Sequence, residues 1–333
     1  MKRIVSFALV VLMLVAICAG CADKSESSDR KTKPTTAQNP TGGSNPGESQ
    51  PSTGPSGSEP QPSNPQPSEP APSDPKPSEP QPSEPEPPVP PTPDVEPGRY
   101  TRDELESMNT KVNGWGLGPH TDAEGRPIDA TRAQDKYGKY DAYYIMPSDG
   151  KIYLTFDEGY ENGYTGKILD VLKEKNVKAV FFITMPYAKS EPELVQRMID
   201  EGHVVGNHSV KHKSMPTLSI DKQIEEVMDL HEYVKEHFGY EMTLFRPPMG
   251  EFSEQSLAVL QNLGYKTIAW SFAYYDYDPA NQPNPQKAFD KVVGAAHSGG
   301  IFLLHAVSET NTNILGDVID AFRNQNFELA LLG

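Results

Sequence analysis

The sequence predicts an α/β fold for residues 99–333, a distorted barrel of the (β/α)7 type, preceded by a signal segment at 1–21 and a disordered Pro-rich linker at 22–98. Apolar, strand-like runs alternate with helix-like segments along 99–333, which is typical of a parallel sheet covered by helices. Ionisable residues follow four of these strands, and the active sites of α/β barrels form where the strands end. We therefore expect one folded domain with a site at that edge.

The first 21 residues have the features of an export signal. Lys2 and Arg3 precede an apolar run at 4–17, which is shorter than the roughly 20 residues that span a bilayer. The segment ends in Ala-Gly-Cys and resembles a bacterial lipobox, although Cys18 stands where an aliphatic residue is usual. We expect cleavage before Cys21 and a lipid on its sulfur, with an uncleaved anchor as the alternative. Both readings predict an extracytoplasmic protein attached to the membrane.

Residues 22–98 repeat Pro, Ser, Glu and Gln and have little to bury, which predicts a linker. In polyproline II form, at about 3.1 Å per residue, 60 to 70 residues would reach on the order of 200 Å. That reach suits a tether into a cell wall, and a simple spacer is the alternative. The net charge of −16 argues against a nucleic-acid partner. Both cysteines lie in the signal, so residues 99–333 contain no thiolate that could act as a nucleophile or a metal ligand. We also expect the protein to be a monomer.

Seven strands and six helices are expected, each strand being a short apolar run bounded by turn residues. Ser190, Ser219 and Ser253 precede three of the helices and are predicted N-caps, because a serine hydroxyl accepts a hydrogen bond from the first helical turn. Seven strands would form an incomplete version of the eight-stranded barrel. The expected strands are 152–156, 178–184, 203–206, 243–246, 265–271, 300–304 and 327–331, and the helices are 164–175, 191–201, 220–237, 253–263, 286–297 and 312–325.

The first strand ends in two adjacent acids, Asp157 and Glu158. Alone, such a pair is as often a solvated turn or a helix cap as part of a site. His208, Arg246 and His305, however, stand at three further strand ends. Four strand ends with ionisable residues are hard to explain as separate solvated loops, so the sequence predicts a single active site.

His208 and His212 are four residues apart, so one helical turn would bring both imidazoles to the same side. This spacing suits zinc or a similar divalent ion with an open position for water. Taken alone the pattern is weak, and histidines without a metal are the alternative.

Two prolines follow Arg246, and they fix the backbone and remove two donors, so the amides of Met249 and Gly250 are candidates to face a ligand. A plain connection is the alternative. His305 ends an apolar strand and is a candidate general acid, with Asp276 as its partner. Trp270 adds an aromatic wall. The aromatic residues from 272 to 277 are either core or a sugar-stacking surface.

Taken in chain order, the segments around Asp157, His208, Arg246, Trp270 and His305 resemble the motifs of the polysaccharide deacetylase family, also called the NodB-homology or carbohydrate esterase family 4 domain. Longer phrases at 155–165, 201–209 and 303–308 are most similar to its delta-lactam-biosynthetic de-N-acetylase branch, which acts on N-acetylmuramic acid in peptidoglycan. The resemblance covers about 110–333. It rests on T-F-D-E-G at 155–159, H-S-V-K-H at 208–212, R-P-P-M-G at 246–250, W-S at 270–271 with Asp276 downstream, and L-L-H at 303–305.

The resemblance implies metal-dependent de-N-acetylation, with Asp157 as general base, Arg246 holding Asp157 ionised, and His305 as general acid oriented by Asp276. It implies that His208 and His212 are ligands of a divalent metal ion, and zinc is the expected ion. The family has a second Asp where this chain has Glu158, so we expect Glu158 to be at best a weak or water-mediated ligand. Implied substrate-binding residues are Pro248, Met249, Gly250, Trp270 and Leu304.

The expected substrate is peptidoglycan or a related N-acetylated glycan. Two other activities remain open at this point, deacetylation of N-acetylglucosamine polymers and O-acetyl xylan esterase activity. A non-catalytic wall-binding module is a third alternative, although a pure binder would not require Asp157, Arg246 and His305. A metalloprotease is disfavoured because no Glu directly follows His208.

Overall fold

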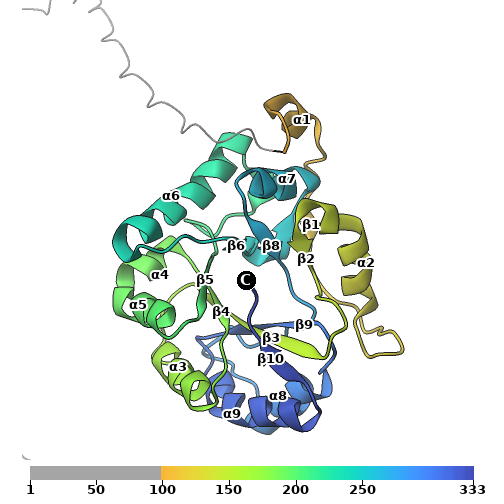
Figure 1. Ribbon diagram of the computed structural model, residues 1–333, viewed down its shortest axis with the longest axis vertical. Coiled ribbons are helices and arrows are strands. Elements are labelled where there is room, and N and C mark those ends of the chain that lie inside the picture. Colours follow the sequence, from red (N-terminus) through yellow and green to blue (C-terminus); the bar gives the residue numbers. More distant parts are fainter. Residues whose placement is uncertain (1–98) are drawn as a thin grey trace, which may run out of the picture. The chain divides into compact units, whose positions relative to one another are not determined.

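A computed structural model describes residues 99–333 (Figure 1). The predicted signal segment, the lipidated Cys21 and the linker lie outside the described residues. Within 99–333, no helix combines the length and the apolar character needed to cross a membrane.

The central sheet is parallel and curls into a distorted barrel, as predicted (Figure 1). β3 pairs with β9 on one side and with β4 and β10 on the other. After β8, Ser271 and Phe272 hydrogen-bond to Ile301 of β9, which brings the two ends of the curled sheet together. The strands are β2 (Ala142–Tyr143), β3 (Lys151–Glu158), β4 (Val180–Ile183), β5 (Val204–Asn207), β6 (Leu244–Phe245), β8 (Lys266–Ile268), β9 (Gly300–His305) and β10 (Glu328–Ala330).

Helices cover the outer face of this sheet, and the six expected helices are all present. Ser219 and Ser253 cap α6 and α7 as predicted, since each hydroxyl accepts an N–H of the first turn. The prediction for Ser190 was wrong, because Ser190 is the last residue of α4 and Glu191 is the N-cap of α5. The helices are α1 (Arg102–Ser107), α2 (Ile128–Tyr137), α3 (Thr165–Glu174), α4 (Met185–Ser190), α5 (Pro192–Asp200), α6 (Ile220–Phe238), α7 (Glu254–Asn262), α8 (Pro285–Gly294) and α9 (Glu309–Asn324).

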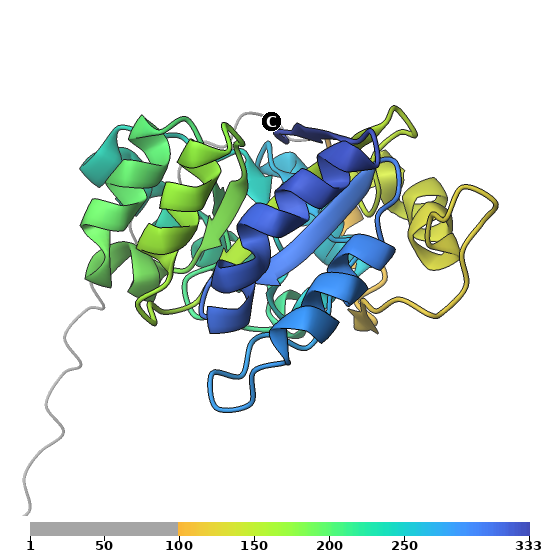
Figure 2. The ribbon, with the colours of Figure 1, turned by 90° about the horizontal axis from the view of Figure 1, so that it is seen from below.

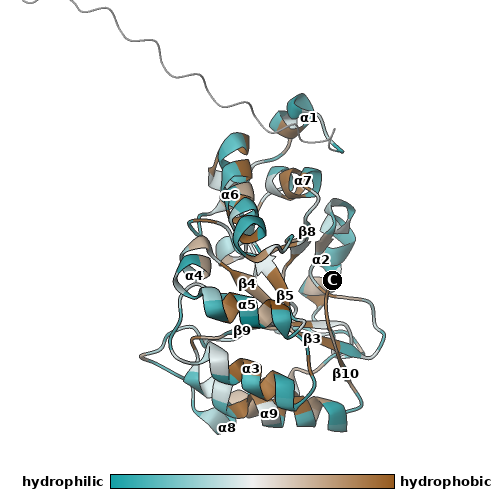
Figure 3. Ribbon diagram, turned by 60° about the vertical axis from the view of Figure 1, so that its left-hand side comes forward, coloured by the Kyte–Doolittle hydropathy of each residue, from teal (hydrophilic) through white to brown (hydrophobic). Residues whose placement is uncertain are grey.

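The two faces of β3 have different neighbours. Ile152, Leu154 and Phe156 pack outward in the main core with the apolar sides of the helices, whose two-sided character is visible in Figure 3. Tyr153 packs inward with Phe182 and other residues of the neighbouring strands. Because side chains alternate along a strand, Asp157 continues the inward row and Glu158 the outward row.

The lead-in at 99–144 forms elements that were not expected from the sequence. Its short strand β1 (Asn113–Gly114) pairs antiparallel with β7 (Glu251–Phe252), directly after the Arg-Pro-Pro turn. β2 adds a parallel strand beside β8. A second core of aromatic and aliphatic side chains joins this lead-in to α7. The lead-in therefore supports the two loops that follow β6 and β8.

Candidate active site

A pocket of about 530 Å³ lies where the parallel strands end. Residues that follow β3, β5, β6, β8 and β9 line it, so it gathers the segments singled out in the sequence. The lining residues are Asp157, Gly159, Tyr160, His208, His212, Pro247, Met249, Gly250, Trp270, Ala273, Tyr274, Tyr277, Leu303, His305 and Val307.

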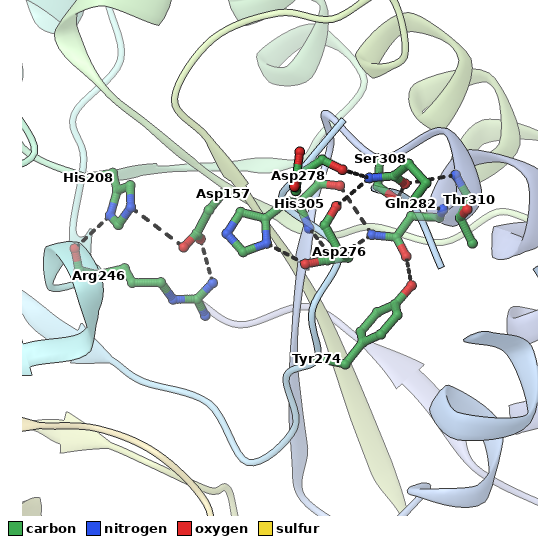
Figure 4. A network of polar contacts seen from close by, with 11 residues as sticks. Asp157, His208, Arg246, Tyr274, Asp276, Asp278, Gln282, His305, Ser308 and Thr310 are labelled. Carbon is green, nitrogen blue, oxygen red and sulfur yellow. Dashed lines mark hydrogen bonds and ion pairs between the residues drawn. The ribbon is translucent and has the colours of Figure 1, made fainter. Parts of the chain in front are cut away.

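Asp157 forms a buried ion pair with Arg246 at the floor of this pocket (Figure 4). The Nη1 of Arg246 donates to Oδ1 of Asp157 at 2.7 Å. Burial is the largest single influence on the pKa of Asp157 and would raise it. The charges of Arg246, His208 and His305 and the hydrogen bond from Arg246 together outweigh burial, so the pKa is lowered. Asp157 is therefore a carboxylate at neutral pH.

Arg246 is fully buried and held on every side. Its Nε and Nη2 donate to the carbonyls of Ile268 and Ala269, at 3.1 and 3.2 Å. The guanidinium lies over the ring of Phe182, 4.2 Å from its centroid. Phe182 in turn needs Gly206 on β5, where an added Cβ would lie 2.4 Å from the ring. Adjacent strands thus fix the position of the guanidinium.

His305 and Asp276 form a second pair beside the first (Figure 4). The Nδ1 of His305 lies 2.7 Å from Oδ1 of Asp276, and the His305 amide donates to Oδ2. Asn311 of α9 also donates to Asp276, at 2.6 Å. Burial, the largest influence, would lower the pKa of His305, but the hydrogen bond and charge of Asp276 outweigh it and the pKa is raised. His305 is thereby favoured in the protonated form.

His208 and His212 lie together at the pocket wall, with ring centroids 4.8 Å apart. The expected helical turn was wrong: Ser209 and His212 have φ of 69° and 52°, so the segment is an irregular loop. Asn207 and Glu226 hold this loop through hydrogen bonds to its backbone amides. The loop achieves the proximity that a helix would have given.

Glu158 lies on the opposite face of β3 from Asp157 and does not line the pocket. It is fully buried between β3 and the helices, where the hydroxyl of Thr165 lies 3.4 and 3.5 Å from its two oxygens. Burial, together with the nearby charge of Glu161, raises its pKa well above the usual value. The structure therefore removes Glu158 from the candidate ligand set, because the alternation of side chains along the strand turns it away from the imidazoles.

The two imidazoles are suited to a divalent ion. Burial lowers the pKa of His208 to about 4 and also lowers that of His212, so both are neutral, as metal ligands must be. The Nδ1 of His208 lies 2.9 Å from the Arg246 carbonyl, which places the proton on Nδ1. The unprotonated Nε2, 3.6 Å from Oδ2 of Asp157, is then the nitrogen that can bind a metal ion. Within 99–333, no group of three or more His, Cys, Asp or Glu residues is arranged as a metal site. The fit thus rests on His208 and His212.

The turn after Arg246 contributes substrate-facing backbone. Met249 and Gly250 both have positive φ and line the pocket, as does Trp270. The Gly250 amide donates to the Pro247 carbonyl, so of the two amides predicted to face a ligand only that of Met249 remains a candidate.

At two of the predicted substrate-binding positions, the residue that lines the pocket is the preceding one in the sequence. Pro247, and not Pro248, lines the pocket, and Pro248 is buried. Leu303 lines it in place of Leu304, which packs in the core with the helices. The reason is the alternation along β9: His305 and Leu303 share one face, and Leu304 lies on the other.

Sequence reasoning missed several residues of the site. Tyr160 and Tyr277 line the pocket, and the aromatic run at 272–277 was the only signal for the second. Asn311, which holds Asp276, had no signal in the sequence. Trp115 of the lead-in donates its indole N–H to the Trp270 carbonyl at 2.9 Å.

Comparisons with known proteins agree on one family. Residues 145–268 match the sequence profile of the family described as polysaccharide deacetylase. The chain is 44% identical to peptidoglycan-N-acetylmuramic acid deacetylase PdaA of Bacillus subtilis, over 67% of this chain and 86% of that protein. It is 32% identical to peptidoglycan-N-acetylglucosamine deacetylase PgdA of Listeria monocytogenes, over 55% and 38% of the two chains. The solved structure of Bacillus subtilis PdaA, a family 4 carbohydrate esterase, superposes with a TM-score of 0.64 at 38% identity, over 67% of this chain and 95% of that one.

Proposed function

The chain belongs to the polysaccharide deacetylase family, and we propose that it removes the N-acetyl group from N-acetylmuramic acid in peptidoglycan. It is a hydrolase of carbon–nitrogen bonds that acts on cell-wall glycan. The muramic assignment is supported by the 44% identity to PdaA, which extends over most of that protein. One structural relationship carries the proposal: Asp157 and His305 are paired residues of adjacent strands, held in opposite protonation states.

The register places this acid and base side by side. Asp157 of β3 pairs with His305 of β9, and parallel strands lie about 4.8 Å apart. Both side chains line the same pocket. Arg246 keeps one ionised, and Asp276 favours the protonated form of the other. Two titratable groups whose environments push their pKa values apart are the arrangement that acid–base catalysis requires.

In the proposed reaction, Asp157 takes a proton from the attacking water, whose oxygen forms a bond to the carbonyl carbon of the acetyl group. His305 has its Nδ1 proton engaged by Asp276, so its Nε2 proton is the one available to the amide nitrogen. Protonation of that nitrogen allows the carbon–nitrogen bond to break, and acetate and an amine leave. Asp276 acts as the positioning residue for His305, as in other carboxylate–imidazole pairs.

Deacetylases of this family depend on a metal, and His208 and His212 would hold a divalent ion, with zinc as the proposed identity, that polarises the acetamide carbonyl and the water. The amide of Met249 is the proposed backbone donor to the developing oxyanion. The muramic product then carries a free amine near its lactyl carboxylate, the two groups that a muramic δ-lactam joins.

Mass spectrometry of purified muropeptides, before and after incubation with the protein, tests the proposal. We expect loss of acetyl from muramic acid, located by fragmentation, and no release by the Asp157→Asn variant. Loss from glucosamine alone would instead favour the activity of the Listeria relative. Equal release by Asp157→Asn and the wild type would overturn the assignment of the base. If neither the muropeptides nor acetylated xylan lost acetyl groups, the result would favour the alternative of a non-catalytic wall-binding module.

A peptidoglycan substrate lies outside the cytoplasmic membrane, and this is the coarse location that the function requires. The finer proposal is a lipoprotein anchored through Cys21, with residues 22–98 as its tether and 99–333 as the catalytic domain. Labelling with a radioactive fatty acid tests the anchor. We expect the label on the wild type and none on Cys21→Ser.

A further inference from the structure

Asp276 is a buried carboxylate, and no Lys or Arg forms an ion pair with it in the part of the chain that the structure describes. A buried carboxylate is costly unless hydrogen-bond donors surround it. Three donors do so here: the ring Nδ1 and the backbone amide of His305, at 2.7 and 2.9 Å, and the side-chain amide of Asn311, at 2.6 Å. Among residues 99–333, Asn311 is therefore the one donor to this carboxylate that does not come from His305 itself.

We propose that Asn311 is a positioning residue for the general acid, and that its side-chain amide holds the Asp276 carboxylate in the rotation that presents one oxygen to the His305 ring. The inference rests on the proposed function and adds to it a residue that does not touch the substrate. Asn311 is buried and does not line the pocket, so it can affect the reaction only through Asp276 and His305.

The surroundings of Asn311 admit one orientation of its side-chain amide. The Nδ2 donates to Oδ2 of Asp276 and also to the backbone carbonyl of His305, the second at 3.2 Å. The Oδ1 accepts the hydroxyl of Tyr274, which points toward the Asp276–His305 pair (Figure 4). An amide turned over would set its oxygen against a carboxylate and a carbonyl, which are both acceptors. The Tyr274 hydroxyl and the two acceptors thus determine which end of the amide faces Asp276.

Three elements of the fold meet at this contact. The loop between β8 and α8 carries Tyr274 and Asp276, His305 ends β9, and Asn311 lies in the first turn of α9. Figure 2 shows this loop and the start of α9 at the same end of the sheet. The hydroxyl of Ser308 caps α9 by accepting the backbone N–H of Asn311 at 3.0 Å. The backbone of Asn311 is therefore held in place independently of its side chain.

The other titratable groups that face His305 come from separate elements. They are Asp157 of β3, His212 after β5, Arg246 after β6 and Tyr277 of the loop between β8 and α8. Lys291 of α8 lies 5.9 Å from the ring centroid of Tyr274. Substitution of Asn311 leaves all of these groups in the chain, so a change in the pKa of His305 would report on the orientation of Asp276.

Histidine NMR and steady-state kinetics of the zinc-loaded full-length chain test the inference. The chain has eight histidines, and the signal of His305 is assigned by its absence in His305→Gln. In Asn311→Leu we expect the pKa of His305 to fall, because the hydrogen bond and charge of Asp276 that oppose burial are no longer aimed at the ring. The kcat should fall by about tenfold, with KM within about twofold of the wild type, because Asn311 acts on proton transfer and does not contact substrate.

Tyr274→Phe keeps the ring and removes only the hydroxyl, so it supplies a second test if Asn311→Leu does not fold. We expect a smaller fall in the pKa of His305 in Tyr274→Phe. Adding Tyr274→Phe to Asn311→Leu should cause no further fall, because the hydroxyl acts through the amide. Asn313→Leu, which changes an exposed residue of the same helix, is the matched control and should leave this pKa unchanged.

The NMR titration does not depend on turnover, so it separates this inference from the proposed function. If the wild type releases no acetate while the pKa of His305 falls in Asn311→Leu, the proposed function fails and the positioning of His305 stands. Lower activity in Asn311→Leu with an unchanged or raised pKa of His305 would overturn the positioning role. So would an equal effect in Asn313→Leu or, where Asn311→Leu does not fold, an unchanged pKa in Tyr274→Phe. Additive effects of Tyr274→Phe and Asn311→Leu would overturn the part of Tyr274.

Discussion

Asp157 and Glu158 are neighbours in the sequence, but their carboxyl groups lie on opposite faces of β3, and the pKa of Asp157 is lowered whereas that of Glu158 is raised. Asp157 faces the pocket and is ionised by Arg246, whereas Glu158 faces the helices and has a pKa raised well above the usual value. Because side chains alternate along a strand, Asp157 is placed to take part in the reaction, whereas Glu158 is part of the packing between the sheet and the helices.

Glu158→Gln should therefore have little effect, because an amide closely replaces a protonated carboxyl group. We expect activity within about twofold of the wild type and a change in the free energy of unfolding below about 1 kcal/mol. Asp157→Asn should reduce kcat by about 100-fold or more. Acetate release, zinc titration and denaturant unfolding measure these effects. A tenfold loss of zinc affinity in Glu158→Gln would return Glu158 to the ligand set.

Arg246→Met should destabilise the protein by about 3–5 kcal/mol, because it leaves Asp157 as an unpaired buried charge. The double variant Asp157→Asn/Arg246→Met should be less destabilised than the sum of its single variants, since no charge then remains buried. Denaturant unfolding of the four proteins forms the cycle. Arg132→Met, an exposed position on α2, is the matched control. Additive effects within the cycle would show that the ion pair does not hold Asp157.

The order of strands and helices could be predicted from the sequence because each buried strand is a continuous apolar run, and because helices have caps such as Ser219 and Ser253. The face of the sheet on which each side chain at a strand end lies could not be predicted. Leu304 was predicted to bind substrate and Glu158 to be at best a weak or water-mediated ligand, but neither lines the pocket. An apolar strand without polar alternation gives no signal of which row of side chains faces inward.

Contacts between distant segments also escaped prediction. Asn311 reaches Asp276 across 35 positions, and the strands β1 and β2 have two residues each, too few to show a period. The histidine pair was predicted from its spacing and from the family resemblance. The loop found in place of the expected helical turn depends on Glu226, which lies on the next helix.

The pH dependence of kcat/KM should have an alkaline limb set by His305. His305 must be protonated to donate, and its raised pKa puts the loss of activity above the ordinary value of about 6.5. Asp276→Asn removes the charge that opposes burial, so the pKa of His305 should fall and the limb should move to lower pH. Asp290→Asn, an exposed position on α8, is the control. An alkaline limb that stays in place in Asp276→Asn would exclude His305 as the acid.

Gly250→Ala should raise KM by about tenfold, because two independent constraints require glycine at this position. The residue has φ of 67°, and an added Cβ would lie 2.6 Å from the ring of Trp270. Trp115 limits the movement that could relieve this contact, since its backbone amide donates to the Gly250 carbonyl at 2.9 Å and its indole donates to the Trp270 carbonyl.

Gly114→Ala is the matched control, because an added Cβ at that lead-in position meets nothing within 4 Å. Steady-state kinetics separate KM from kcat, and intrinsic fluorescence gives a second readout, since Trp115 and Trp270 are the two tryptophans of the chain. We expect Gly250→Ala to shift the emission and raise KM, and Gly114→Ala to do neither. Trp115→Phe, which removes one hydrogen bond, should lose about 0.5–1.5 kcal/mol of stability. A normal KM in Gly250→Ala would show that Trp270 does not need its present position to bind substrate.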